Sequence, residues 1–110
     1  EEIYGCKVEY DLKTALKDAD VVMGLRMQLE RQNEGLFPSL EEYTNSYVLS
    51  KETIKYAKKD VLVMHPGPMN RGIEILPEIA DSSHSVIIEQ VANGVAVRMA
   101  LLFLMLGGKL

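Results

Sequence analysis

The fold of this chain is decided by one stretch, Val61-Leu62-Val63-Met64-His65-Pro66-Gly67-Pro68-Met69-Asn70-Arg71-Gly72. Its first four residues are all apolar, which is typical of a buried strand in a parallel sheet. The turn that follows then lies at the carboxyl end of a strand, where open α/β sheets bind their ligands. The plainer alternative is a turn that only ends the strand, because Pro and Gly mark turns in every class of fold.

The turn has the composition of a rigid backbone contact. Pro66 and Pro68 have no backbone N–H group, so their carbonyls are presented on a stiff frame without a local donor. Gly67 lets a ligand approach the backbone closely. The Gly67–Pro68 bond is a candidate for the cis isomer, since X–Pro bonds adopt it at little cost. Such a turn is suited to contact a ligand through its main chain.

Strands and helices alternate along the rest of the chain. Three strands are predicted, at Lys7–Tyr10, Val21–Met23 and Val61–Met64. Helices are predicted from the N-cap Asp11 to about Lys17, from a Ser39–Glu42 capping box, from the Ser50 cap, and over 78–80 after Pro77. This alternation predicts an α/β fold, a right-handed parallel Rossmann-like sheet with flanking helices.

The last segment is apolar on every side. From Val95 to Leu106 the only charged residue is Arg98, and a helix of that composition has to be buried all round. At this length it is too short to cross a bilayer, so we expect a core helix and no membrane contact. The alternative is a helix that buries itself in a dimer.

Composition excludes several classes of function. A net charge of −4 and the lack of a basic run argue against a nucleic-acid partner. The single cysteine, Cys6, cannot form an intramolecular disulfide and fits a reducing cytosol; we expect it to be a buried, inert thiol. No metal-ligand spacing and no Gly-x-Gly-x-x-Gly motif is present, so neither a metal nor a cofactor is predicted. The acidic first residues do not form a signal peptide, and the lack of a starting Met fits a partial chain.

Arg26 is the strongest single candidate for a binding residue. It follows the apolar run 21–23, where a guanidinium needs an anionic partner, and its planar fork suits a carboxylate. The alternative is a surface arginine paired with a nearby acid. Gln28, two residues on, projects the same way in an extended segment, although a solvated amide would fit too. Glu30 and Glu74 are acids that would orient Arg26 from behind.

Other polar residues have less specific signals. Arg71 either clamps Glu74 or contacts a substrate, and the clamp is the favoured interpretation. His65 is discounted as a general base, because it stands at the strand end beside a proline. His84 is expected in a solvated loop. The polar loop from Gln32 to Tyr47 is either a capped surface connection or a lid.

Three motifs together resemble the bacterial aspartate carbamoyltransferases. The stretch 65–75 is similar to a signature of the family's aspartate-binding half. Leu25-Arg26-Met27-Gln28-Leu29-Glu30-Arg31 resembles a second signature, and 93–100 resembles the family's last helix. The family's two-domain subunit is much longer. Its carbamoyl-phosphate half has no counterpart here, nor have the first strand and helix of the aspartate half.

The resemblance implies a division of the chain and a set of roles. Residues 1–92 correspond to the aspartate-binding α/β domain, and 93–110 to a helix that packs on the carbamoyl-phosphate domain. Arg26 and Gln28 would bind L-aspartate, and main-chain carbonyls of 66–68 would accept from the carbamoyl NH₂ group. Behind these groups would lie three supporting residues, Glu30, Arg71 and Glu74. The loop 32–47 would close over the substrates.

The activity implied by the resemblance is transfer of the carbamoyl group of carbamoyl phosphate to the amine of L-aspartate, in pyrimidine biosynthesis. No residue of this chain is assigned as a proton-transferring catalyst, and the chain alone is expected to be inactive. The family implies a cytoplasmic homotrimer, with dihydroorotase or a regulatory subunit as possible partners. Two alternatives are a transferase for ornithine, whose family has a cysteine where Pro66 stands, and a non-catalytic assembly module.

Overall fold

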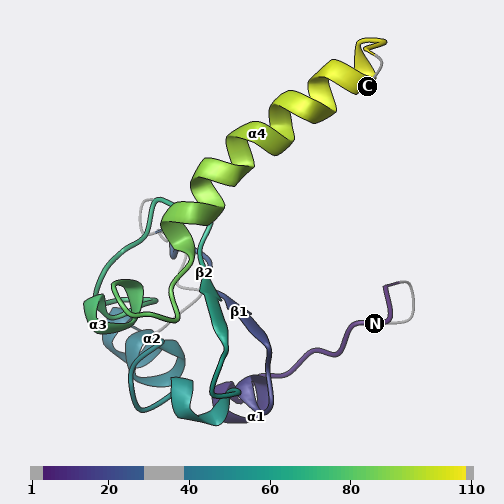
Figure 1. Cartoon of the computed structure of the whole chain (residues 1–110). Helices are drawn as coiled ribbons and strands as arrows, with labels where there is room; N and C mark the ends of the chain where they lie inside the picture. Colours follow the sequence, from purple (N-terminus) through teal and green to yellow (C-terminus); the bar gives the residue numbers. More distant parts are fainter. Residues whose placement is uncertain (1–3, 29–38, 109–110) are drawn as a thin grey trace.

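The structure, a computed structural model, describes residues 4–28 and 39–108 (Figure 1). Within them the chain forms five helical segments and two strands. In chain order these are α1 (Leu12–Leu16), β1 (Val21–Met23), α2 (Leu40–Tyr47), the 3-10 turn η2 (Ile54–Tyr56), β2 (Leu62–Met64), α3 (Pro77–Ala80) and α4 (Ile87–Met105). The predicted α/β class is confirmed.

The two strands form a parallel sheet. Val21, Val22 and Met23 pair with Leu62, Val63 and Met64 in register. The far edge of β2 is extended by an isolated bridge to Ser85, in which Val63 accepts from Val86 over 3.0 Å and donates to the His84 carbonyl over 2.8 Å. His84, expected in a solvated loop, is therefore partly buried beside the sheet.

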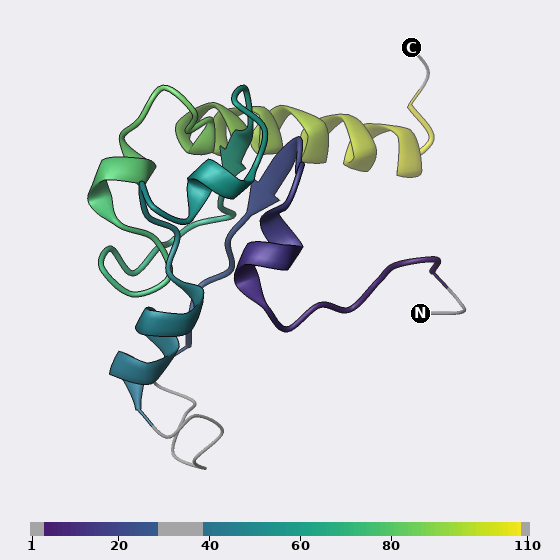
Figure 2. The same cartoon turned by 90° about the horizontal axis from the view of Figure 1, so that it is seen from below.

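The third predicted strand, Lys7–Tyr10, is absent from the described structure. Residues 4–10 are exposed and reach away from the domain as an arm (Figure 2). A strand needs a neighbour to pair with its backbone groups, and no β-bridge joins residues 7–10 to a described strand. The prediction of a buried thiol is wrong for the same reason, because Cys6 lies on the arm and is exposed.

The core lies on one face of the sheet only. Val63 is fully buried, and Val22 packs against the same cluster. The cluster consists of Leu16, Leu49, Ile54, Val61, Val63, Ile75, Ile79, Ala80 and Ile87. On the opposite face, Val21, Met23 and Leu62 are 50%, 50% and 44% exposed. The expectation of strands buried on both faces is thus wrong for the described residues, although parallel sheets are normally covered on both sides.

The helix starts agree well with the sequence signals. Asp11 Oδ2 accepts from the Thr14 backbone N–H over 2.8 Å, and Ser39 Oγ accepts from the Glu42 N–H over 3.0 Å. Pro77 occupies the first turn of α3, where its missing N–H has no consequence. The helix predicted after the Ser50 cap shortens to the 3-10 turn η2, preceded by a turn closed by the Ile54 N–H to Ser50 carbonyl bond of 2.9 Å.

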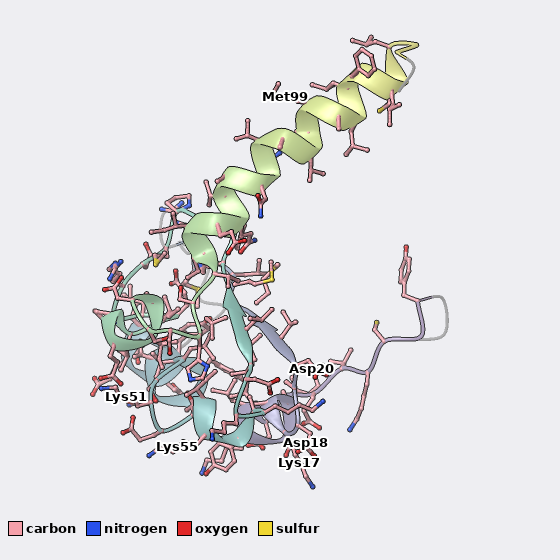
Figure 3. All side chains as sticks on the ribbon, viewed as in Figure 1. Lys17, Asp18, Asp20, Lys51, Lys55 and Met99 are labelled. Atoms are coloured by element: carbon pink, nitrogen blue, oxygen red, sulfur yellow. The ribbon has the colours of Figure 1, made fainter. Side chains whose placement is uncertain are left out.

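The last helix is longer and more exposed than expected. α4 begins at Ile87, the only buried residue in it, and then projects beyond the domain (Figures 1 and 3). Met99, labelled in Figure 3, is 66% exposed. The radius of gyration is 16.6 Å, against about 13 Å for a compact chain of this size. Burial of this helix on all sides is therefore not achieved by the described residues.

The length of α4 also corrects the expectation that this segment is too short to cross a bilayer. Its 19 residues extend for roughly 28 Å, because the helix starts well before the apolar run at Val95. By length and composition alone, α4 is able to cross a membrane. Core helices of globular proteins have the same length and composition, so these two properties do not distinguish the cases.

Candidate active site

The candidate site lies where the two parallel strands end. Met23 and Met64 are register partners at the carboxyl ends of β1 and β2. The backbone N–H of Gly24 donates to the Met64 carbonyl over 3.0 Å, so the strands stay paired up to the point where both leave the sheet. The segments 24–28 and 65–70 therefore start side by side, at the edge where α/β sheets bind ligands.

The turn at 66–68 has the backbone that its sequence predicted. The Gly67–Pro68 peptide bond is cis, and Gly67 has a φ of +67°. Glycine adopts this left-handed φ freely, whereas the Cβ of other residues is strained there. A Cβ added at Gly67 would meet no atom within 4 Å, so the need for glycine comes from the backbone and not from crowding. Pro66, Gly67 and Pro68 are all exposed, which keeps the turn accessible to a ligand.

The segment that leaves β1, residues 24–28, places one side chain in the core. Met27 is buried, whereas Arg26 is partly exposed and Gln28 is exposed. Leu25, two residues before the buried Met27, is 68% exposed, so the segment does not alternate as a regular strand would, and the common direction of Arg26 and Gln28 stays a prediction. Asn70 ties the segment to the neighbouring loop, because its Nδ2 donates to the Met27 carbonyl over 2.8 Å. Arg26 and Gln28 thus flank a buried residue whose backbone is tied to the neighbouring loop.

Two buried titratable side chains support the 65–70 loop from beneath. His65 is fully buried, and Glu74 is 3% exposed. His65 Nδ1 accepts from the Gly67 backbone N–H over 2.9 Å, and Glu74 Oε1 accepts from the Asn70 N–H over 2.6 Å. The backbone N–H of His65 donates to Gln90 Oε1 over 3.0 Å, which fixes the loop to the first turn of α4.

The contact between these two side chains is close but not aligned. His65 Nε2 lies 3.3 Å from Glu74 Oε1, which is within ion-pair range. No well-directed hydrogen bond joins the two side chains. In the described parts of the chain, neither Nε2 of His65 nor Oε2, the second carboxylate oxygen of Glu74, has a hydrogen-bond partner. The two side chains are therefore close neighbours without a directed hydrogen bond between them.

Arg71 does not clamp Glu74 as predicted. Its two terminal nitrogens donate to the carboxylate oxygens of Asp81 over 2.6 and 2.8 Å, in a bidentate pair at the surface. These hydrogen bonds lower the pKa of Asp81 and raise that of Arg71. Glu74 faces the other way, toward His65 and the core, because the chain turns sharply between Arg71 and Ile75. The predicted role of Glu74 behind Arg26 stays a prediction.

Two cavities flank the strand ends. The larger, an open hollow of about 600 Å³, is lined by Glu9, Tyr10, Leu12, Val22, Met23, Gly24, Leu25, Tyr43, Tyr47, Leu49 and Glu74. Burial, and then the charge of Glu74, raises the pKa of Tyr43 in this hollow. The smaller, of about 280 Å³, adjoins the turn and is lined by Pro66, Gln90, Val91, Gly94, Val95 and Arg98.

Some predicted elements fall outside the described residues, and some contacts were not predicted. Glu30 and the first half of the 32–47 loop belong to the segment 29–38, which the structure does not describe. The roles of Asn70 and Gln90 were missed, because their partners Met27 and His65 are far from them in sequence. Within the described residues, no group of three His, Cys, Asp or Glu is placed to hold a metal ion.

A family model described as aspartate/ornithine carbamoyltransferase, Asp/Orn binding domain, matches residues 4–105. The chain belongs to this family. The predicted resemblance is thereby confirmed, and the matched residues include α4.

Similar proteins are known in sequence and in structure. The aspartate carbamoyltransferase catalytic subunits of Syntrophus aciditrophicus and Syntrophomonas wolfei are 65% and 59% identical over 103 and 107 residues, covering 94% and 97% of this chain. The chain spans about a third of the length of these relatives, 34% in both cases. The ornithine carbamoyltransferase structure from Pyrococcus furiosus is 31% identical with a TM-score of 0.77, over 90% of this chain and 32% of that one.

Proposed function

We propose that this chain is the amino-acid-binding part of an aspartate carbamoyltransferase catalytic chain. The reaction transfers the carbamoyl group of carbamoyl phosphate to the α-amine of L-aspartate and yields N-carbamoyl-L-aspartate and phosphate. The observation that carries the proposal is the placement of two segments side by side. Arg26 and Gln28 leave β1 next to the exposed 66–68 turn that follows β2, and Asn70 ties the segments together.

The roles of the residues follow from their chemistry. The guanidinium of Arg26 suits the side-chain carboxylate of aspartate, because its planar donors match two carboxylate oxygens. The amide of Gln28 can hydrogen-bond the substrate's amine and carboxylate groups. The main-chain carbonyls of 66–68 accept hydrogen bonds from the carbamoyl NH₂ group. Pro66 and Pro68 have no N–H group that would compete for these carbonyls. Catalysis then rests on orienting two anionic substrates, so that the amine attacks the carbamoyl carbon and phosphate leaves.

Aspartate is the favoured amino acid over ornithine. The relatives at 65% and 59% identity are named for aspartate. Arg26 would attract the side-chain carboxylate of aspartate and repel the side-chain ammonium of ornithine. Transfer to ornithine is the second candidate, since the 31% identical structure from Pyrococcus furiosus is an ornithine enzyme. The two candidates differ only in the amino acid, so a substrate comparison separates them.

The rest of a carbamoyltransferase chain would cover the surfaces that are open here. The uncovered sheet face and the apolar α4 together expose many large apolar side chains, among them Val21, Met23, Leu62 and Met99. We propose that α4 packs on the carbamoyl-phosphate domain, and that this domain supplies the phosphate-binding groups. The chain alone would then be inactive. A cytoplasmic homotrimer, with or without dihydroorotase or a regulatory subunit, belongs to the same proposal.

The test uses what we call the joined chain. It connects this chain to the remaining two thirds of the Syntrophus aciditrophicus subunit, in place of the matching third. In the joined chain, Arg26→Ala removes a charge-assisted contact worth about 1.5–3 kcal/mol, so the KM for aspartate should rise about 12- to 140-fold. The KM for carbamoyl phosphate should change little.

Arg71→Ala is the matched control, because it also removes a guanidinium, and the one it removes contacts Asp81 at the surface. It should leave the KM for aspartate unchanged. Equal effects of the two substitutions would contradict the assignment of Arg26. A joined chain that assembles without any transferase activity would favour the non-catalytic module instead.

A further inference from the structure

His65 is a buried residue of the site to which the proposed function assigns no role. Its ring is fully buried, so it cannot touch either substrate directly. Its Nδ1 nevertheless bonds the N–H of Gly67, the middle residue of the exposed turn. Gly67 supplies the only backbone N–H between Pro66 and Pro68, since prolines have none. This hydrogen bond links the turn directly to a buried side chain.

The bond to Gly67 requires one particular tautomer of the imidazole. Because Nδ1 accepts a hydrogen bond, the neutral ring must have its proton on Nε2. The carboxylate of Glu74 lies 3.3 Å from Nε2 and attracts a proton there. A ring with a proton on Nδ1 would instead direct that proton at the Gly67 N–H and lose the contact. Glu74 thus favours the tautomer that holds the turn.

The same pair is also connected to the aspartate side of the site. Glu74 accepts from the Asn70 backbone N–H, and Asn70 in turn bonds the Met27 carbonyl, next to Arg26 and Gln28. On its other side the His65 ring packs on Gly24, where an added Cβ would lie 3.3 Å from the ring carbon Cδ2. The ring is therefore fixed between the two segments that form the site.

We propose that His65 is a positioning residue for carbamoyl transfer, which holds the 66–68 turn through Gly67 and is itself oriented by Glu74. Its effect is to keep the carbonyls of the turn aimed at the carbamoyl group. This inference rests on the proposed function, since the turn has to be the carbamoyl contact. It goes beyond that function by assigning a buried residue that no substrate reaches.

The test compares two amides at position 65 of the joined chain. The side-chain oxygen of His65→Asn lies near the place of Nδ1 and can accept from the Gly67 N–H. In His65→Gln the amide is one methylene further out, toward Glu74, and the Gly67 N–H has no acceptor. Because His65→Gln loses this hydrogen bond, its kcat/KM for carbamoyl phosphate should be about tenfold below that of the unsubstituted joined chain. His65→Asn should stay within about threefold.

Thermal unfolding and hydrogen exchange separate positioning from simple packing. Both amides remove the same ring, so both variants should lose similar stability. Exchange at the Gly67 amide should speed up about tenfold in His65→Gln and stay near its original rate in His65→Asn. Equal loss of kcat/KM in both variants, or a Gly67 amide that exchanges alike in both, would overturn the proposal.

The outcome also distinguishes a failure of this proposal from a failure of the proposed function. If the unsubstituted joined chain forms no carbamoyl amino acid, the proposed function fails, and the exchange rates of Gly67 still decide whether His65 holds the turn. If the joined chain is active and the two variants behave alike, the proposed function stands and the positioning role of His65 fails.

Discussion

Gly67→Ala tests the claim that the 66–68 turn needs a left-handed backbone at Gly67 for contact with a ligand. Gly67 has a φ of +67°, which costs a residue with a Cβ about 1–2 kcal/mol. The added methyl group itself would meet no atom within 4 Å, so no steric penalty is added. The free energy of unfolding of the joined chain should therefore fall by about 1–2 kcal/mol. Urea unfolding measures this loss.

The same substitution should also affect binding, because a turn that relaxes to negative φ redirects its carbonyls. Loss of one such hydrogen bond, worth about 0.5–1.5 kcal/mol, would raise the KM for carbamoyl phosphate about 2- to 12-fold. Gly72→Ala is the matched control, with a φ of +90° and no atom within 4 Å of the added Cβ. It should lose similar stability with an unchanged KM. An equal change of KM in both variants would refute the reasoning.

Two further predictions concern contacts beside the turn. Asn70→Ala removes the hydrogen bond to the Met27 carbonyl, worth about 1 kcal/mol, so the KM for aspartate in steady-state assays should rise about fivefold. Asn70→Asp also lacks the donor and should have the same effect. A normal KM for aspartate in either variant would contradict the link. The pair with Arg71 lowers the pKa of Asp81 below its usual 3.8, so the pair stabilises the fold above that pH and its contribution is lost as the pH falls through the lower folded value. In urea unfolding, Asp81→Asn should therefore lower the free energy of unfolding only slightly at neutral pH, because the ion pair that it removes is exposed to solvent, and not at all in acid. A loss of stability that grows in acid would contradict the pairing.

The elements that the sequence predicted correctly are those defined by neighbouring residues. The apolar run 61–64 and the Pro-Gly-Pro turn determine a strand end without help from the rest of the chain. The caps Asp11 and Ser39 act on amides three residues away. Lys7–Tyr10 has the composition of a strand, but a strand forms only by pairing with another, and no described strand pairs with this segment.

The supporting contacts of the site could be predicted less well, because they connect distant residues. Arg71 and Glu74 are three positions apart, which suggests a pair, yet the sharp turn between them sends Arg71 to the surface and Glu74 to the core. The sequence suggests only a general-base role for His65, because it does not show that the ring accepts a hydrogen bond from the Gly67 N–H. The hydrophobic pattern of the sequence likewise does not show that the apolar helix α4 is exposed.

The measurement that tests the central claim most directly is product formation by the joined chain, with carbamoyl phosphate and either L-aspartate or L-ornithine. The account predicts that N-carbamoyl-L-aspartate forms, that ornithine is a poor acceptor, and that this chain alone forms neither product. A correctly assembled joined chain that uses ornithine in preference to aspartate, or that forms no product with either, would contradict it.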